Sequence, residues 1–341
     1  MDSILYCMTA TSLTQNALDI VCRNGQFALA RASEKILANQ YDDGIIRQAL
    51  HYYAKNTLPR VLPIFPALVT LSCKAVGATS ENLRSVATSI LLVTSSGDIH
   101  DDIVDNSSRK FSRKTIVGKY GKDIALLAGD VLLVQGMTAL QNECDLSTKQ
   151  RKTIADSVAA SMVEIVKAEA MEISLWQKTN VTPEEYFDVI RLKGGVAELH
   201  CRIGGIIGGG NEEAIDNLAG YGRVIGILST LKEEFVDMNS CVELGHRIKH
   251  ELPPYPMLCA MQNKGFKKKT AMYKKAKFSD EDLQRIAENV LGSSEVEKLN
   301  SKFKAFGRKE IANNNLLKCK NRAAEELVLL LEALSDELLI V

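Results

Sequence analysis

The sequence contains little proline for its length. Only seven of its 341 residues are proline, and these lie within 59–66, at 183 and within 253–256. Because proline breaks the interior of a helix at a cost of about 3 kcal/mol, the long stretches without proline are compatible with many long helices. A multi-strand β-sandwich is disfavoured, since such folds need turn residues every ~8–12 positions.

The sequence also lacks an excess charge, a long apolar run and paired cysteines. Its 42 basic residues balance 42 acidic residues, which excludes the broad basic surface of a nucleic-acid-binding protein. No run of about 18 apolar residues occurs, so we predict no membrane span. The N-terminus does not resemble a signal peptide, and the eight cysteines have no CxxC spacing. These features predict reduced thiols and a cytoplasmic protein.

Apolar residues recur three and four positions apart over much of the chain, which predicts an all-α protein of about ten helices. We expect a single domain over residues 1–341, whose N-terminal helices occupy about 1–40. The basic stretch 263–279 predicts a mobile, solvated loop, with contact to anionic lipid or a partner as the alternative. The helical pattern covers 14–38, 83–105, 122–142, 151–176, 184–208, 214–238, 280–292 and 322–340.

Two acidic groups carry the chemistry. Residues 100–105 read His-Asp-Asp-Ile-Val-Asp, and on a helix Asp101 and Asp105 lie one turn apart on the same face. Residues 233–237, Glu-Glu-Phe-Val-Asp, repeat that spacing. Clustered carboxylates of this kind suit hard divalent cations, with Mg²⁺ favoured, although a solvated acidic helix end is the alternative. The bases at 109–114 predict a diphosphate bridged by Mg²⁺.

These motifs occur with other short matches in a fixed order: Lys-Tyr-Gly at 119–121, Leu-Ala-Gly-Asp at 127–130 and Glu-Tyr-Phe-Asp-Val-Ile-Arg-Leu-Lys at 185–193. The set resembles the trans-isoprenyl diphosphate synthases, the polyprenyl synthetase family, over most of the chain. The resemblance implies an all-α isoprenoid synthase bundle around a central cavity. It also implies Mg²⁺-assisted ionisation of an allylic prenyl diphosphate, a homodimer and three Mg²⁺ ions.

The resemblance assigns roles to individual residues. It makes the acids of both motifs the metal ligands, namely Asp101, Asp102, Asp105, Glu233, Glu234 and Asp237. It makes four bases the ligands of the diphosphate, namely Arg109, Lys110, Lys193 and Arg247. Asp101, Asp102, Asp105 and Lys193 are the implied catalytic residues. The implied cavity wall contains Ser96, Gly97, Phe111 and Thr230.

The chain departs from the family at positions that bind isopentenyl diphosphate. An early Gly-Gly-Lys-x-x-Arg-Pro stretch is replaced by Val-Leu-Pro-Ile-Phe-Pro at 61–66, and the second arginine after the first motif is Phe111. Loss of these cations removes the charge that holds a diphosphate. We therefore predict a terpene-synthase-like member that ionises a C15–C25 substrate and then eliminates, captures water or cyclises.

Two alternatives remain open. One is a chain-elongating prenyltransferase that makes a geranylgeranyl-type or longer prenyl diphosphate. The other is a non-catalytic subunit that pairs with an active prenyl synthase. The small residues Ser96 and Gly97, which precede the first motif, indicate a deep pocket or, alternatively, close helix packing.

Overall fold

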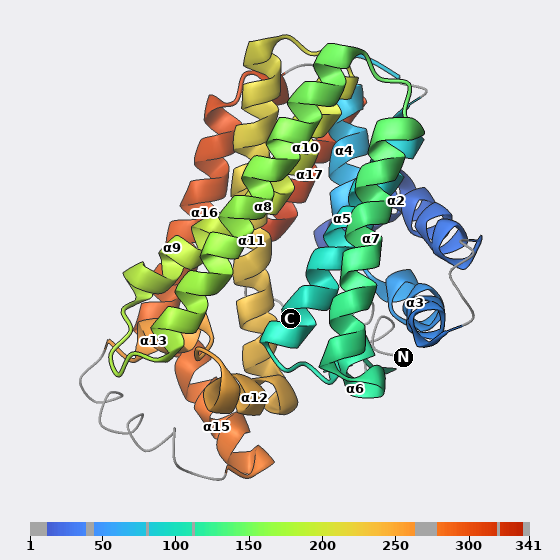
Figure 1. Cartoon of the computed structure of the whole chain (residues 1–341). Coiled ribbons are helices and arrows are strands. Elements are labelled where there is room, and N and C mark those ends of the chain that lie inside the picture. Colours follow the sequence, from blue (N-terminus) through green and yellow to red (C-terminus); the bar gives the residue numbers. More distant parts are fainter. Residues whose placement is uncertain are drawn as a thin grey trace. The chain divides into compact units, whose positions relative to one another are not determined.

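The computed structural model describes residues 12–38, 44–79, 82–110, 113–262, 278–318 and 321–336 (Figure 1). These ranges are almost entirely helical, and the strands within them are two segments of two residues each. The contacts divide the chain into two compact units, which are described in turn. The single domain expected over residues 1–341 stays a prediction.

Unit 1 contains residues 1–156, 200–216 and 319–326. Its elements begin with α2 (Ser12–Ala38), α3 (Ile45–Asn56), η1 (Leu58–Arg60), α4 (Ile64–Ala75) and α5 (Leu83–Val104). They continue with the hairpin β1 (Arg109–Lys110) and β2 (Arg113–Lys114), then α6 (Ile116–Tyr120) and α7 (Lys122–Asn142). The unit also includes the first turns of α8 (Thr148–Trp176) and α17 (Arg322–Asp336), and the second half of α10 (Gly195–Ile207).

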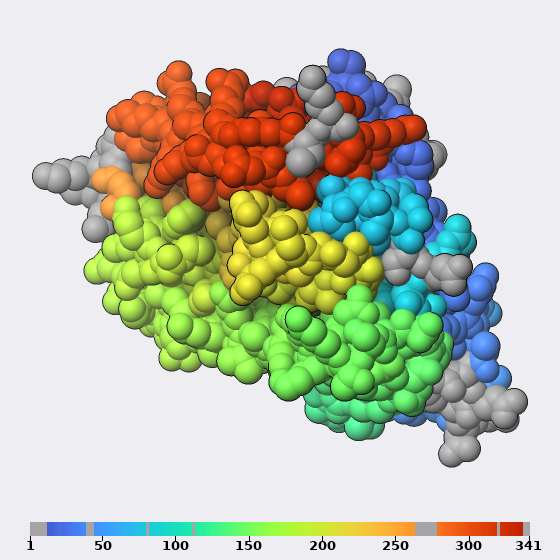
Figure 2. All heavy atoms as spheres, turned by 90° about the horizontal axis from the view of Figure 1, so that it is seen from above, coloured from blue at the N-terminus to red at the C-terminus, as the bar shows by residue number. Residues whose placement is uncertain are grey.

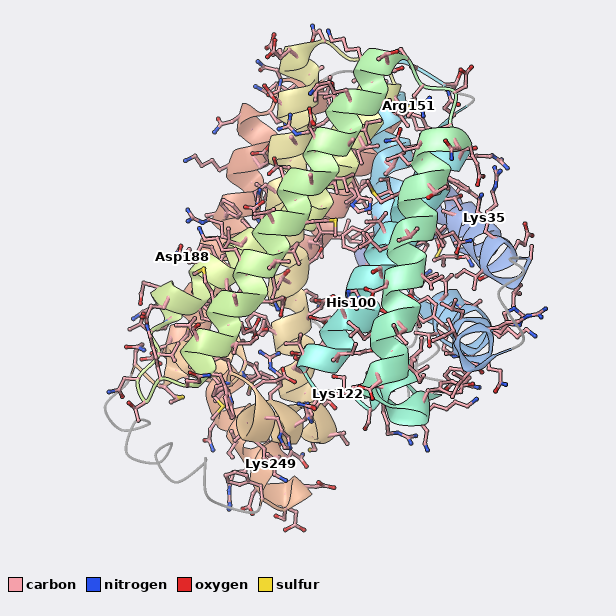
Figure 3. The ribbon with its side chains drawn as sticks, in the orientation of Figure 1. Lys35, His100, Lys122, Arg151, Asp188 and Lys249 are labelled. Atoms are coloured by element: carbon pink, nitrogen blue, oxygen red, sulfur yellow. The ribbon has the colours of Figure 1, made fainter. Side chains whose placement is uncertain are left out.

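Helix α5, which carries the first acidic motif, packs along α7 (Figure 1). Gly136 of α7 allows this approach, because an added Cβ would lie 2.8 Å from the backbone oxygen of Ser89 on α5. Gly129 leaves room for the ring of His100, whose Nε2 lies 3.4 Å from a carboxylate oxygen of Asp130 (Figure 3). These contacts fix the end of α5 against its neighbour.

Arg151 closes the C-terminal end of α7 (Figure 3). Its guanidinium donates to the carbonyl oxygens of Leu140, Cys144 and Leu146, each at 3.2 Å. The last carbonyls of a helix have no partner within the helix, and Arg151 satisfies that of Leu140. Its bonds to Cys144 and Leu146 hold the loop that follows α7.

The glycine group near residue 207 allows α10 to approach α4. A Cβ added at Gly204 would lie 2.6 Å from Ser72 Cβ. A Cβ added at Gly208 would lie 2.9 Å from the carbonyl oxygen of Cys73. In Figure 2 the end of α10, in yellow, lies beside the end of α4, in light blue. Gly209 has a φ of 72°, which suits glycine after a helix. Helix α10 thus ends with its backbone packed closely against α4.

Unit 2 contains residues 157–199, 217–318 and 327–341. It holds most of α8, the first turn of α10 and most of α17. Its other elements are α9 (Pro183–Lys193), α12 (Cys241–His250), α13 (Tyr255–Ala260), α15 (Asp280–Leu291), α16 (Ser294–Asn313), η3 (Leu316–Lys318) and α11 (Glu212–Asn239), whose first five residues belong to unit 1.

The helix expected over 184–208 is two helices, so this prediction is wrong. Helix α9 starts with a capping box between Thr182 and Glu185 and ends at Lys193. Gly194 follows, and its backbone meets Gly226 of α11 so closely that an added Cβ on Gly226 would lie 2.7 Å from Gly194 Cα. Glycine disfavours a continuous helix and permits this contact.

The periodicity also missed several helices, among them α3, α4, α12 and α16. Most of the expected basic loop, 263–277, lies outside the described residues, as do Phe111 and residues 337–341. Helix α7 is long and apolar enough by composition to cross a membrane, a property that core helices of soluble proteins share.

Candidate active site

The first acidic motif forms the C-terminal end of α5. The N–H of Asp105, which caps this helix, donates to the carbonyl oxygen of Asp101 at 2.9 Å. The two side chains share a helix face, and each offers a carboxylate oxygen within 4.8 Å of the other. Oxygen donors at this separation suit a hard divalent cation. Asp101 and Asp105 are therefore the candidate metal-binding pair of unit 1.

Asp102 has a different environment from this pair. It is only 7% exposed, and burial raises its pKa to about 7 while the nearby Lys110 opposes that shift. The carboxylates of Asp98 and Asp101 raise its pKa further. Asp102 thus lies in the protein interior beside a lysine, where a carboxylate helps to hold that cation in place.

Lys110 is engaged by an acid that the sequence analysis did not assign. Its Nζ forms an ion pair with Asp98, which lies one turn before Asp102 on α5. Burial lowers the pKa of Lys110, but Asp98 and Asp102 outweigh that effect and raise it overall. Lys110 is consequently charged and held against α5, whereas a base that binds diphosphate was predicted at this position.

Arg109 begins a short basic hairpin. Strand β1 pairs antiparallel with β2, so that Arg109 lies opposite Lys114 and Lys110 lies opposite Arg113. Like charges on opposite strands repel each other, and an anion relieves that repulsion. The residues after the first motif therefore have a positive charge that suits a diphosphate.

The predicted wall residues differ in their surroundings. Ser96 is 2% exposed, which favours a packing role within α5. Gly97 is exposed, and a Cβ added there would meet nothing within 4 Å. The hydroxyl of Thr230 donates to the carbonyl oxygen of Gly226 at 3.0 Å, in its own helix. A side chain added at Gly97 would therefore have room beside α5.

The second acidic motif lies near the C-terminal end of α11 in unit 2. The second of its three acids, Glu234, is 5% exposed and accepts hydrogen bonds from three residues. The donors are the hydroxyl of Tyr186 at 2.8 Å, the guanidinium of Arg247 at 3.1 Å and the N–H of Tyr255 at 2.6 Å. These bonds occupy the carboxylate, whereas Glu233 on the same helix is exposed.

Arg247 lies at the centre of this cluster. Its side chain is 10% exposed and forms ion pairs with Asp237 at 2.6 Å, Glu234 at 3.1 Å and Glu251 at 3.0 Å. Burial alone would lower the pKa of Arg247, but the surrounding acids raise it further. Burial raises the pKa of Asp237 to about 6, against the effect of Arg247. The structure thus gives Arg247 protein carboxylates as partners.

Lys193, at the end of α9, lies against two acids of α8. Its Nζ is 2.6 Å from Glu172 and 3.1 Å from Glu169. Burial would raise the pKa of Glu172, but Lys193 and Arg247 outweigh it and lower the value overall. The hydroxyl of Tyr186 also donates to Glu172 at 3.3 Å. Lys193, Glu172 and Tyr186 therefore connect to the buried cluster of the second motif.

Sequence reasoning missed four members of these clusters: Asp98 in unit 1 and Glu169, Glu172 and Glu251 in unit 2. A signal existed in α8, because Glu169 and Glu172 lie three residues apart and share a helix face. The sequence does not say which helix meets that face. Their partner Lys193 becomes apparent only from the packing of α8 and α9.

The residues fit Mg²⁺ unevenly. Asp101 and Asp105 present paired oxygens, which is the donor chemistry that Mg²⁺ requires. Glu234 and Asp237 already satisfy Arg247, and Asp102 is buried beside Lys110. Asp101 and Asp105 are consequently the donor pair of unit 1 that fits a metal. In unit 2, Glu233 is the exposed acid of the second motif.

The polyprenyl synthetase family model matches residues 45–290. The chain belongs to the polyprenyl synthetase family. It is 30% identical over 284 residues to the short chain isoprenyl diphosphate synthase of Methanothermobacter thermautotrophicus, covering 81% of this chain and 82% of that one. It is 27% identical over 180 residues to the geranylgeranyl diphosphate synthase of Methanosarcina mazei, covering 52% and 55%. The predicted family is confirmed.

The fold is also that of this polyprenyl synthetase family. The geranylgeranyl pyrophosphate synthetase from Geoglobus acetivorans superposes with a TM-score of 0.78 at 21% identity, covering 93% of this chain and 99% of that one. At this identity the likeness establishes the fold alone. The predicted all-α isoprenoid synthase fold is confirmed.

Proposed function

We propose that this chain is a Mg²⁺-dependent prenyltransferase that extends an allylic prenyl diphosphate with isopentenyl diphosphate. In this reaction the allylic C–O bond breaks, a C–C bond forms to isopentenyl diphosphate, a proton is lost and inorganic diphosphate leaves. The observation that carries the proposal is the paired carboxylates of Asp101 and Asp105 at the end of α5 in a member of this family. The names of the relatives favour elongation over the terpene-synthase-like interpretation.

Asp101 and Asp105 would hold Mg²⁺ in unit 1, and Glu233 would offer a carboxylate ligand in unit 2. Bound Mg²⁺ supplies a positive charge that stabilises the departing diphosphate. Arg109 adds positive charge from the hairpin of unit 1. Lys193, at the end of α9 in unit 2, is a further predicted base, and there its partners are Glu169 and Glu172. Electrostatic stabilisation of the leaving group is the main catalytic effect in this proposal.

The remaining predicted residues act by position. Arg247 holds Glu234 and Asp237 on one side of α11, which orients the helix that presents Glu233. Asp102 and Asp98 hold Lys110 beside the first motif. These residues keep the metal-binding and anion-binding groups in place, because buried ion pairs fix side-chain geometry.

A second candidate function is ionisation of an allylic diphosphate without isopentenyl diphosphate, which gives a hydrocarbon or an alcohol. The observation that favours it is the shortage of bases around 61–66. Arg60, the nearest base there, donates at 2.5 Å to the carbonyl oxygen of Asn56 in the preceding turn, and Leu62 is 44% exposed. Lys110 is likewise held by Asp98.

One assay distinguishes these functions. The purified chain is incubated with Mg²⁺ and geranyl, farnesyl, geranylgeranyl or geranylfarnesyl diphosphate, with and without isopentenyl diphosphate. Longer diphosphates that form only with isopentenyl diphosphate support the proposal. Volatile hydrocarbon or alcohol formed without it would overturn the proposal in favour of the second function. No turnover, together with binding to another prenyl synthase, would indicate a non-catalytic subunit.

We also propose that the chain forms a homodimer through the outer face of α7. Leu127, Val131, Val134 and Thr138 recur at helical spacing along a cavity of about 810 Å³ on this face. Leu127 is 50% exposed and Val134 is 64% exposed. A second copy would cover this apolar stripe, because soluble monomers rarely leave such surfaces in water. A dimer face also accounts for the apolar composition of α7, in keeping with a cytoplasmic protein without a membrane span.

A further inference from the structure

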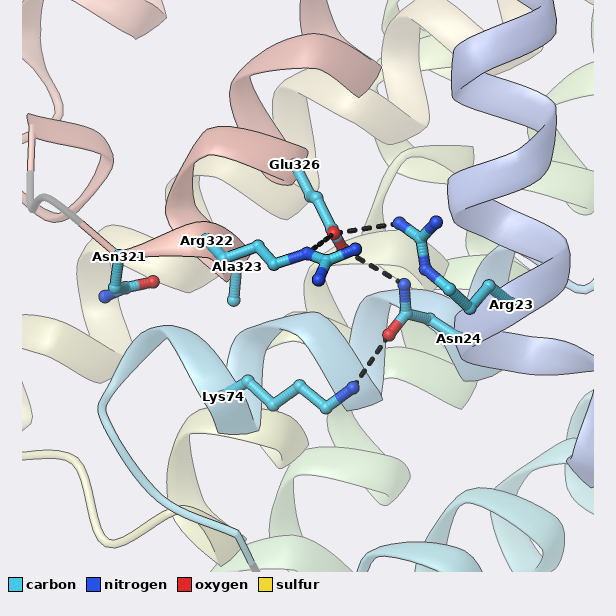
Figure 4. Close-up of a pocket in the computed structure, with 7 residues that line it drawn as sticks. All are labelled: Arg23, Asn24, Lys74, Asn321, Arg322, Ala323 and Glu326. Atoms are coloured by element: carbon cyan, nitrogen blue, oxygen red, sulfur yellow. Dashed lines mark hydrogen bonds and ion pairs between the residues drawn. The ribbon is translucent and has the colours of Figure 1, made fainter.

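A charged cavity of about 370 Å³ lies in unit 1, where α2, α4 and the start of α17 meet (Figure 4). The proposed reaction uses none of its residues. The cavity is lined by Arg23, Asn24, Lys74, Asn321, Arg322, Ala323 and Glu326.

The lining of this cavity has an excess of positive charge. Arg23, Lys74 and Arg322 are cations, and Glu326 is the one acid among the lining residues. Two positive charges therefore remain uncompensated in a concave site. Helix α17 begins at Arg322, and the first turn of a helix adds a further partial positive charge.

A buried acid and a buried amide hold these cations around the cavity. Glu326 is 8% exposed, and its Oε1 accepts from Arg23 Nη2 and Arg322 Nε, both at 2.8 Å. Its Oε2 accepts from Asn24 Nδ2 at 3.1 Å, and Asn24 is 3% exposed. Lys74 Nζ donates to Asn24 Oδ1 at 2.9 Å. The cations are thus positioned before any ligand arrives.

The cations retain the capacity to bind oxygen ligands. A guanidinium has five N–H donors and an ammonium has three, and the bonds just described use one donor on each side chain. Planar guanidinium groups bind phosphate oxygens through paired hydrogen bonds. The arrangement therefore suits a compact anion with several oxygens.

This cavity is separate from the first acidic motif. Lys74 lies at the end of α4, near the start of α5, whereas the motif lies at the other end of that helix. A helix rises 1.5 Å per residue, so the 22 residues of α5 separate the two places by roughly 30 Å. With one carboxylate in its lining, the cavity does not need Mg²⁺ to attract an anion.

We propose that this cavity is a metal-independent binding site for a diphosphate group. Two sources carry that group: inorganic diphosphate and the headgroup of a prenyl diphosphate. The cavity provides the same cations to both, so the two ligands are compared directly. The proposal does not depend on the proposed catalytic function, because binding is measured without turnover.

The test is isothermal titration calorimetry of the full chain with inorganic diphosphate in excess EDTA. We expect saturable binding at one site per chain. Arg322→Gln and Lys74→Met should each weaken it about tenfold, which corresponds to one charge-assisted hydrogen bond. A parallel titration with farnesyl diphosphate shows whether the prenyl chain adds affinity.

The matched control is Arg308→Gln. Arg308 is an exposed arginine of α16 that pairs with the carboxylate of Asp336. Arg322 pairs with Glu326 in the same way. This control should bind diphosphate as the unmodified chain does. The side chain of Arg322 is 77% exposed, so its substitution should leave the fold intact. Thermal unfolding of the variant checks this. Absence of saturable binding in EDTA, or equal binding by Arg322→Gln and Arg308→Gln, would overturn the proposal.

Discussion

The guanidinium of Arg247 holds the carboxylate of Asp237, with Nη1 2.6 Å from Oδ2. The same guanidinium also binds Glu234 and Glu251, and its side chain is 10% exposed. An arginine with three acidic partners inside unit 2 is a structural centre for the second motif. Its removal would leave buried carboxylates without a counter-charge.

We expect Arg247→Met to lower the free energy of unfolding by about 3–5 kcal/mol, the usual cost of breaking a buried ion pair. Urea denaturation measures the loss. Arg223→Met is the matched control, because Arg223 also pairs with two acids, Glu164 and Glu198, but its side chain is 25% exposed. The control should lose less stability, and equal losses would contradict the central role of Arg247.

The two glutamates that begin the second motif should behave differently. Glu233→Gln should lower Mg²⁺-dependent turnover roughly 100-fold with little change in stability, because loss of a metal ligand removes several kcal/mol of charge stabilisation. Glu234→Gln should lower the free energy of unfolding by about 1–3 kcal/mol, since it weakens a buried charged network. Steady-state kinetics and urea denaturation measure both variants. Similar profiles for the two would contradict the separate roles.

Asp102 should make the metal-free protein less stable as the pH rises. Its pKa is about 7 in the folded state and 3.8 ordinarily, so between these values the folded state binds more protons than the unfolded state. The free energy of unfolding therefore falls with rising pH, by up to about 1.4 kcal/mol per pH unit. Asp102→Asn should lack this contribution when unfolding is measured in EDTA from pH 4 to pH 7.

The control for this pH dependence is Asp156→Asn. Asp156 is an exposed acid that pairs with Lys152 in the neighbouring turn. Its substitution should leave the pH dependence as it is in the unmodified chain. If the free energy of unfolding changed equally with pH in Asp102→Asn and in the unmodified chain, the burial of Asp102 would be contradicted.

Lys193 should contribute more to the stability of unit 2 at neutral pH than at acidic pH. Lys193 lowers the pKa of Glu172 from 4.5, so their attraction is present above the unfolded value and is lost as the pH falls through the folded value. We expect Lys193→Met to reduce stability at pH 7, because Glu172 then remains charged and buried without that partner. The difference from the unmodified chain should shrink as the pH approaches 4. A difference that is constant with pH would contradict the pairing.

The outer face of α7 should govern association. We expect Leu127→Glu combined with Val134→Glu to convert a dimer into a monomer in sedimentation velocity experiments, because two charges would be buried at the contact. Val242→Glu is the control, since Val242 is 77% exposed on α12, a helix that contributes no residue to this stripe. A dimer that survives the double substitution would place the contact elsewhere.

The sequence by itself determined the helices with strong periodicity and the two acidic motifs. Helical spacing requires only 3.6 residues per turn, so Asp101 and Asp105 share a face wherever α5 lies. Ordered short motifs also sufficed to identify the family, which the family match confirms. The break at Gly194 was missed, because a glycine within an apolar pattern interrupts a helix only when its surroundings favour the interruption.

Only the tertiary structure decided which charged groups meet. Glu234 comes from α11 and its partner Arg247 from α12, while Lys193 and Glu172 come from α9 and α8. Such pairs depend on the faces that helices present to one another, and long-range packing sets those faces. The same packing buries Asp102 beside Lys110 and leaves Asp101 and Asp105 paired at the end of α5. Residue spacing placed the acids along each helix, and burial determined their different roles.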